Sequence, residues 1–170
     1  MPAERVEIIY NWCDEQALQL PDVVDASEFG MEERFNVVFA GTMGKGQALD
    51  TVIRAAKRVE AMDKHIQFVF VGGGMEVENL KSLAQELEVG NVLFLPRMPI
   101  HEVGRVLAAA EVLLVHLKDD PLYETTIPSK TQAYMSIGKP ILMAVKGDAA
   151  QLIATAGAGH HALPENEVSL

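Results

Sequence analysis

The sequence ETTIPSKTQAYMSIGKPIL, residues 124–142, contains a loop, a helix, a turn and the start of a strand in immediate succession. Pro128 favours a helix start, because its missing backbone N–H would lack a helical partner in any case, and Ser129 is a favourable N-terminal cap. Gly138 predicts the turn that ends the helix, and residues 140–145 are the apolar strand that follows. One helix-to-strand unit of a parallel sheet is therefore expected here.

The same alternation of strand and helix extends through most of the chain. Short apolar runs rich in Val, Phe, Ile and Leu are typical of buried parallel strands, and amphipathic helix patterns separate them. We expect an α/β fold: a Rossmann-like, doubly wound parallel sheet with helices on both faces and its ligand outside the carboxyl ends of the strands. The predicted strands are 35–40, 66–71, 92–95, 112–115 and 140–145, and further helices are predicted within 49–59, 80–87, 100–110 and 147–155.

Composition narrows the class of protein. A length of 170 residues suits one domain that buries roughly two thirds of its unfolded surface. The formal charge of −10 argues against a nucleic-acid-binding surface, and it requires local cations and backbone N–H groups to hold any anionic ligand. Cys13 is the only cysteine, so no internal disulfide forms, and no apolar run of about 18 residues predicts a membrane span. A cytoplasmic protein is expected.

The helix start at residues 128–130 is a candidate anion site. Its first backbone N–H groups have no helical acceptor, and Lys130 adds a positive charge. Glu124, just upstream, offers a carboxylate that can accept hydrogen bonds from sugar hydroxyls. A phosphate site beside a hydroxyl acceptor is what a nucleotide sugar requires, whereas a capped helix with a solvated lysine and glutamate is the purely structural alternative.

These motifs in this order resemble the nucleotide-sugar-binding half of the retaining glycosyltransferases of family four, the GT-B group 1 enzymes of bacterial surface-polysaccharide assembly. The resemblance runs from Val6 to Asn166, and it is closest to members with the helix start Pro128-Ser129-Lys130, which include aminosugar transferases. It implies transfer of a sugar from a nucleoside diphosphate sugar, expected to be a UDP-sugar, to a polysaccharide or lipid-linked acceptor. It also implies no metal ion and no cofactor, because basic residues and helix dipoles hold the diphosphate in this family.

The resemblance also divides the chain. Residues 1–34 resemble the crossover segment and loop between two domains, and residues 35–170 resemble the nucleotide-sugar-binding domain, truncated at its C-terminus. The acceptor would be held by an N-terminal domain that the sequence lacks, so the 170 residues alone are expected to bind donor without transferring sugar. For the full-length protein a peripheral position on the inner face of the membrane stays open.

Glycine-rich turns after the first two predicted strands are candidate donor contacts. Gly41 and Gly44 follow the first strand, and Gly72 and Gly73 follow the second, where glycine permits close backbone approach. By the resemblance, Lys45 would contact the diphosphate; a solvated turn lysine is the alternative. The glycine order after the first strand, G-x-x-G-x-G, fits neither the P-loop nor the dinucleotide fingerprint.

Three other segments complete the candidate donor site. Arg97 and Met98 follow the third strand, in a loop that packs around the base in the resembled fold, and Arg97 would stack on the base or neutralise phosphate. His116 at the end of the fourth strand is a candidate contact to the donor sugar, with a hydrogen-bonded structural histidine as the alternative. Ser129 and Lys130 would stabilise the departing diphosphate.

One position departs from the resembled family. Many relatives carry two glutamates with seven residues between them, the first near the sugar and the second on the ribose hydroxyls. Counting back from the glycine turn, Ala133 stands at the second position and Thr125 at the first, beside Glu124, which keeps the sugar-facing catalytic role. Ala133 cannot accept a hydrogen bond from ribose. Either Gln132 or Ser129 substitutes for the missing carboxylate, the ribose is held differently, or the donor binds more weakly.

Three other functions stay open at this point. A GT-B epimerase acting on a UDP-sugar shares this half of the fold. A nicotinamide-dependent oxidoreductase domain is disfavoured by the glycine order. A non-catalytic nucleotide-binding or interaction module gains weight from Ala133.

Overall fold

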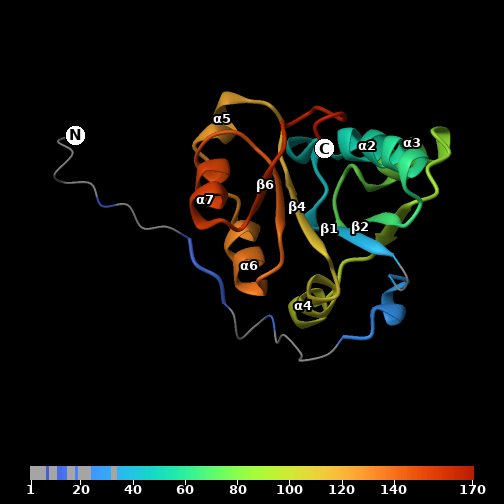
Figure 1. Cartoon of the computed structure of the whole chain (residues 1–170), viewed down its shortest axis with the longest axis horizontal. Helices are drawn as coiled ribbons and strands as arrows, with labels where there is room; N and C mark the ends of the chain where they lie inside the picture. Colours follow the sequence, from blue (N-terminus) through green and yellow to red (C-terminus); the bar gives the residue numbers. More distant parts are fainter. Residues whose placement is uncertain (1–6, 8–10, 15–17, 19–23, 32–33) are drawn as a thin grey trace.

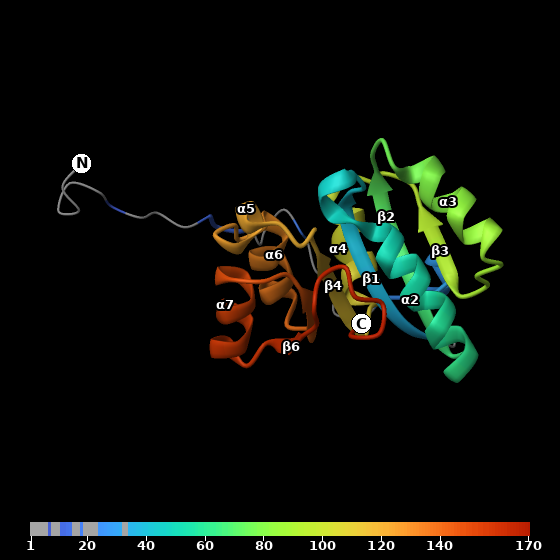
Figure 2. The same cartoon turned by 90° about the horizontal axis from the view of Figure 1, so that it is seen from above.

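Six parallel strands form one central sheet in the order β3-β2-β1-β4-β5-β6 (Figures 1 and 2). The structure is a computed structural model that describes residues 7, 11–14, 18, 24–31 and 34–170. The predicted α/β, Rossmann-like class is confirmed. The strands are β1 (Phe35–Thr42), β2 (Ile66–Gly73), β3 (Val92–Leu95), β4 (Val112–His116), β5 (Ile141–Ala144) and β6 (Gly159–His161).

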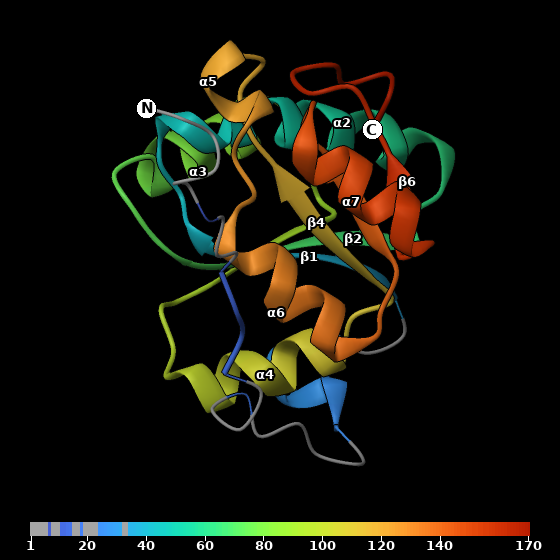
Figure 3. The same cartoon turned by 90° about the vertical axis from the view of Figure 1, so that its left-hand side faces the viewer.

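Helices cover both faces of this sheet (Figure 3). Helices α2 and α3 pack on one face, whereas α4 and α6 pack on the other, and α7 adds its apolar side to the core that α4 and α6 form. No helix in the described part of the chain is long and apolar enough to cross a membrane. The helices are α2 (Leu49–Met62), α3 (Val77–Glu86), α4 (Ile100–Ala108), α5 (Pro121–Glu124), α6 (Ser129–Ile137) and α7 (Asp148–Ala156), with 3-10 turns η2 (Ala26–Phe29) and η3 (Lys45–Gln47).

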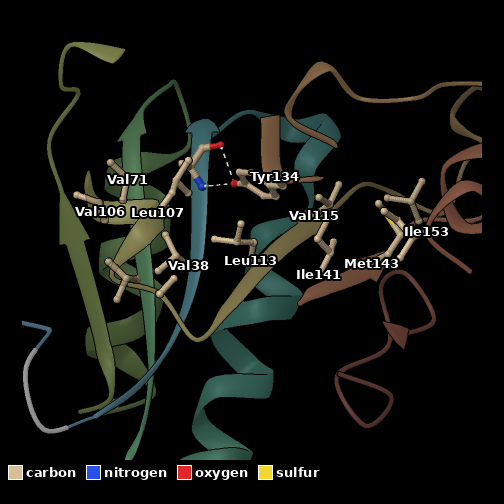
Figure 4. Packing of buried hydrophobic residues seen from close by; sticks show 14 of the residues in the cluster. Val38, Val71, Val106, Leu107, Leu113, Val115, Tyr134, Ile141, Met143 and Ile153 are labelled. Carbon is tan, nitrogen blue, oxygen red and sulfur yellow. Dashed lines mark hydrogen bonds between the residues drawn. The ribbon is translucent and has the colours of Figure 1, made fainter. Parts of the chain in front are cut away.

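Two apolar cores result from the alternation of side chains along the strands. In β1, Val38 and Ala40 enter the core under α4 and α6, while Val37 and Phe39 enter the core under α2 and α3. A strand that is covered on both faces must be apolar at successive positions, which is why residues 37–40 form a continuous apolar run. Figure 4 shows part of the core under α4 and α6.

The strands β1 and β4 part at the centre of the sheet. β1 pairs with β2 from Phe35 to Thr42, but it pairs with β4 only at Val37–Val112 and Val38–Leu113. The chain order reverses at this pair of strands, which makes it the topological switch point where ligands of open α/β sheets bind. Beyond Val38 and Leu113 the two strands are no longer paired, and we call the region between them toward the carboxyl end of the sheet the crevice.

Tyr134 of α6 occupies the base of this crevice. Its hydroxyl lies 2.8 Å from the backbone nitrogen of Ala40 and 3.3 Å from the Ala40 oxygen, so it accepts one hydrogen bond and donates the other (Figure 4). The side chain is 1% exposed, and burial raises the pKa of the phenol. The neutral hydroxyl thus satisfies backbone groups that β4 no longer reaches.

Some local expectations were wrong. Ser129 is the first helical residue of α6 and not its cap; Pro128 takes the cap position, with φ −59° and ψ 136° and no capping side-chain hydrogen bond. The sequence did not predict β6 or α5, because Gly159–His161 lacks an apolar run and Pro121–Glu124 is a single turn. Most of residues 1–34, the predicted crossover segment and loop, lies outside the described residues; within the described part, Ala26–Phe29 form η2.

Candidate functional site

A hollow of about 540 Å³ opens at the carboxyl end of the sheet, beside the crevice between β1 and β4. We call it the carboxyl-end hollow. Helix α4 supplies an apolar wall through Val103 and Leu107. Six of the residues that the sequence nominated for donor binding line this hollow together, namely Gly41, Gly72, Gly73, Arg97, Met98 and Lys130.

Close backbone packing shapes the floor of the hollow. Gly41 and Gly72 have φ values of 139° and 132°, and they lie side by side in the register of β1 and β2. A Cβ atom on Gly72 would overlap the carbonyl oxygen of Gly41, whereas a Cβ atom on Gly73 would meet nothing within 4 Å. Gly72 is therefore required by packing, and Gly73 leaves open space toward the hollow.

Lys130 brings a buried positive group to the hollow. Its Nζ atom is buried, has no hydrogen-bond partner among the described residues, and lies 3.4 Å from the centroid of the Phe39 ring. Burial lowers the pKa of this amine to about 7. The face of the Phe39 ring attracts the ammonium form, but it offsets only part of the cost of burying that charge. The amine is thus held in a place where a bound anion would stabilise its charge.

The charges that line the carboxyl-end hollow have one sign. Arg97 and Lys130 are its cationic residues, and no aspartate or glutamate is present among the described residues that line it. Arg97 is exposed at the rim, whereas the Lys130 amine lies inside. In a chain with a formal charge of −10, this local absence of carboxylates favours an anionic ligand.

The start of α6 adds backbone donors next to Lys130. The first N–H groups of a helix have no helical acceptor, apart from Thr131 N–H, which donates to the Pro128 oxygen at 2.8 Å. Ser129 is exposed and does not line the hollow. In the orientation that satisfies its amide, the Gln132 nitrogen donates back to the Pro128 and Ser129 oxygens at 3.1 Å, so this side chain is engaged at the helix start. Ala133 lines the hollow instead.

Lys45 and Gly44 lie elsewhere. They line a second depression of about 350 Å³ between η3 and helices α2 and α3, in which Asp50, Glu76 and Glu165 supply carboxylates. The structure thus does not bring Lys45 together with Lys130 in one hollow. A contact between Lys45 and the diphosphate stays a prediction.

His116 is a buried residue with both ring nitrogens engaged. Its Nδ1 atom donates to the Gln47 oxygen at 2.7 Å, and its Nε2 atom accepts from the backbone nitrogen of Glu165 at 3.3 Å. Burial lowers the pKa of this imidazole, with the hydrogen bond to Gln47 opposing the shift. The histidine does not line the carboxyl-end hollow, and its geometry matches the structural alternative raised from the sequence.

Glu124, the candidate catalytic residue, ends the short helix α5. Its side chain is exposed, it lies outside the residues that line the carboxyl-end hollow, and its carbonyl group packs against Gly147. Its catalytic role stays a prediction. In the described part of the chain, no group of three or more His, Cys, Asp or Glu residues is placed to hold a metal ion.

Sequence reasoning missed two residues that position the site. Tyr134 forms a hydrogen bond to β1 at the base of the crevice, and Phe39 contacts the lysine amine. In the sequence, however, each of them resembles an ordinary apolar core residue. The available signal was helical spacing, since Tyr134 lies one turn after Lys130 on the same face of α6.

Comparison with known proteins places these features in a family. The model of the family described as glycosyl transferases group 1 matches residues 25–170. The chain is 27% identical over 169 residues to the probable glycosyltransferase WbjE of Pseudomonas aeruginosa, covering 95% of this chain and 41% of that protein. It is 26% identical over 143 residues to the putative colanic acid biosynthesis glycosyl transferase WcaI of Escherichia coli, covering 80% of this chain and 34% of that protein.

A solved structure shares the fold. The crystal structure of HepE from Anabaena in complex with UDP and glucose superposes with a TM-score of 0.78 at 20% identity, covering 98% of this chain and 45% of that one. Relative to the two sequence relatives, the chain spans about two fifths of the length of WbjE and about a third of that of WcaI. Because the family model matches residues 25–170, which include the whole sheet and its helices, the chain belongs to the glycosyl transferases of group 1.

Proposed function

We propose that this chain is the donor-binding part of a glycosyltransferase and that it binds a nucleoside diphosphate sugar in the carboxyl-end hollow. The observation that carries the proposal is the buried, unpartnered amine of Lys130 in a hollow whose described lining residues include no carboxylate. Membership of group 1 supports it. The HepE crystal structures with UDP and with UDP-glucose support a uridine nucleotide as the first donor to test.

The diphosphate would lie between the start of α6 and Lys130. Backbone N–H groups and the amine would share its negative charge there, as at other helix N-termini that hold phosphates. The base would extend toward Arg97 and Met98, next to the apolar wall of α4. Since burial lowers the pKa of the lysine amine to about 7, binding of the anion would favour its charged form.

The transfer step moves one glycosyl group. The bond between the anomeric carbon and the diphosphate oxygen breaks, and its electron pair stays on the diphosphate. The acceptor hydroxyl oxygen bonds to the anomeric carbon on the same face, and its proton passes to the departing diphosphate. Lys130 and the helix start would stabilise the charge that develops on the leaving group.

Three parts of this proposal rest on the family resemblance. Retention of the anomeric configuration, an acceptor-binding domain elsewhere in the full protein, and inactivity of the 170 residues by themselves follow from similarity to family four. The short span of the chain relative to WbjE supports the second of them.

Calorimetric titration of the 170-residue chain with UDP-glucose tests the proposal. We expect saturable binding at pH 6.5, with an accompanying rise in melting temperature because the ligand binds only the folded state. Lys130→Met removes the amine and keeps much of the apolar volume, so it should weaken binding at least tenfold. Lys64→Met, which removes an exposed lysine, should leave the affinity unchanged.

Two results would count against the proposal. One is that none of UDP-glucose, UDP, GDP and ADP binds or stabilises the chain. The other is that Lys130→Met and Lys64→Met bind UDP-glucose as tightly as the unaltered protein.

A further inference from the structure

The side chain of Lys130 packs against the carboxyl end of β1. Its Nζ atom lies 3.4 Å from the centroid of the Phe39 ring. A Cβ atom built on Gly41 would lie 3.0 Å from Nζ and 3.5 Å from Cε, so any side chain at residue 41 would crowd the amine. Glycine at this position therefore admits the end of the lysine side chain to the strand.

This place offers the amine no polar partner. No described residue accepts a hydrogen bond from the buried Nζ atom of Lys130. A buried ammonium ion without a partner loses its hydration and gains little in return, whereas the neutral amine costs much less to bury. We therefore expect the ligand-free protein to hold Lys130 largely neutral above pH 7. The direction of its pKa, which burial lowers to about 7, agrees with this geometry.

The other ionisable groups near the amine do not change their charge around neutral pH. Arg97 lines the same hollow and is exposed, and an arginine side chain keeps its proton in proteins. Tyr134 lines it too, but its hydroxyl is hydrogen-bonded to Ala40, and burial raises the pKa of the phenol. His116, at the end of β4, lies outside the residues that line the hollow, and both its ring nitrogens are engaged.

We propose that binding of the donor anion in the carboxyl-end hollow takes up one proton from the solvent, and that the Lys130 amine receives it. This inference rests on the proposed function. An anion beside the amine stabilises the ammonium form, and the ammonium form in turn holds the anion more tightly, because such coupling is reciprocal. The proton adds to the nitrogen lone pair, and no bond of the donor forms or breaks in this step.

The size of the effect follows from the state of the amine before the donor binds. With a pKa of about 7, roughly nine tenths of the free amine is neutral at pH 8 and about a quarter at pH 6.5. Binding must therefore take up close to one proton at pH 8. We expect the affinity for UDP-glucose to be at least about fivefold weaker at pH 8.5 than at pH 6.5.

Calorimetric titration at pH 8 counts the protons directly. UDP-glucose is titrated into the 170-residue chain in two buffers that differ in their enthalpy of ionisation, and the difference between the two heats gives the protons taken up per ligand bound. UDP-glucose suits this test because it has no phosphate group that titrates near neutral pH. We expect at least about 0.5 proton per ligand. A smaller uptake would overturn the inference.

Two lysine variants assign the proton to one residue. Lys64→Met, at an exposed position, should take up as many protons as the unaltered chain. Lys130→Met should bind UDP-glucose weakly and show almost no uptake. The same uptake in both variants would place the proton on another group and refute the role of Lys130.

Nuclear magnetic resonance supplies a readout that does not need the weakened variant to bind. In a chain labelled with ¹³C-lysine, the Cε signal of Lys130 is the one that Lys130→Met removes. We expect its titration midpoint to lie near pH 7 in the free chain and at least about one pH unit higher with saturating UDP-glucose. An unchanged midpoint would overturn the inference.

The outcomes separate this inference from the function on which it rests. If UDP-glucose does not bind, the proposed function fails and the inference fails with it. If UDP-glucose binds without proton uptake, the proposed function stands and only the inference is overturned.

Discussion

The hydroxyl of Tyr134 lies 2.8 Å from the backbone nitrogen of Ala40, and it joins α6 to the point where β1 leaves β4. This contact anchors α6 to the sheet. Lys130 lies one turn earlier on the same helix. The amine reaches the ring of Phe39, which belongs to the core on the opposite face of the sheet. Lys130 thus extends across the open end of the crevice.

Removal of the tyrosine hydroxyl should destabilise the protein. Tyr134→Phe leaves the Ala40 N–H buried without its acceptor, which should lower the free energy of unfolding by about 1–3 kcal/mol. Urea denaturation at pH 7 measures the loss. Tyr123→Phe is the matched control, because the Tyr123 side chain is only partly buried, and its effect should stay within about 0.5 kcal/mol. Equal losses in the two variants would contradict the structural role of Tyr134.

Lys130 should reduce the stability of the ligand-free protein in a pH-dependent way. Burial lowers its pKa from 10.5 to about 7 in the folded state, so the unfolded chain binds more protons between these two values. Folding therefore carries the full cost of the buried amine below pH 7. This cost decreases as the pH rises and is absent above pH 10.5.

It follows that Lys130→Met should stabilise the ligand-free chain while it weakens donor binding. We expect a gain of roughly 1–3 kcal/mol in the free energy of unfolding at pH 6, smaller at pH 9, because the variant no longer buries an amine. Urea denaturation at both pH values gives the difference. Lys64→Met should show a small change that does not vary with pH, and a similar flat profile for Lys130→Met would sink the argument.

The fold and half of the site could be predicted from the sequence because both depend on local patterns. Apolar runs gave the strands, and Gly41, Gly72, Arg97 and Lys130 each lie beside the carboxyl end of a strand or at a helix start. In a parallel sheet those ends meet at one edge, so the residues had to converge. All four residues line the carboxyl-end hollow at that edge.

The rest of the site depends on long-range contacts that local patterns do not contain. Lys45 enters a different depression because η3 turns it toward α2 and α3, a path that ends at Ala48 with φ 45°. His116 is buried because Glu165, 49 residues later, covers it and donates to its ring. Neither the direction of a turn nor a contact over that separation leaves a periodic signal in the sequence.

His116 should make stability fall in mild acid. Its pKa is lowered below the ordinary value of 6.5, so the unfolded chain binds more protons once the pH falls below that value. The stabilising contribution of the neutral ring is present above pH 6.5 and is lost as the pH falls through the lowered folded pKa. Protonation of Nε2 would also remove the acceptor for the Glu165 N–H.

A variant that cannot titrate separates this effect from general acid sensitivity. His116→Asn should lower the free energy of unfolding by about 1–3 kcal/mol at pH 7.5, because the Glu165 hydrogen bond is lost, and should give a flatter profile between pH 7 and 5. His65→Asn, at an exposed position, should retain the acid-dependent loss. If the two variants lose stability in parallel below pH 6.5, then His116 is not the group responsible.

The adjacent glycines at the end of β2 offer a matched pair for the packing of the hollow's floor. Gly72→Ala combines a φ of 132° with overlap between the new Cβ atom and the Gly41 oxygen, so it should cost about 2–4 kcal/mol and separate the ends of β1 and β2. Gly73→Ala meets nothing within 4 Å and should cost less than about 1 kcal/mol. Urea denaturation of both variants measures the difference between their free energies of unfolding. The sequence shows three identical glycines in a row here, and only the approach of the Gly41 carbonyl distinguishes Gly72 from Gly73, so equal effects would mean that this approach does not occur.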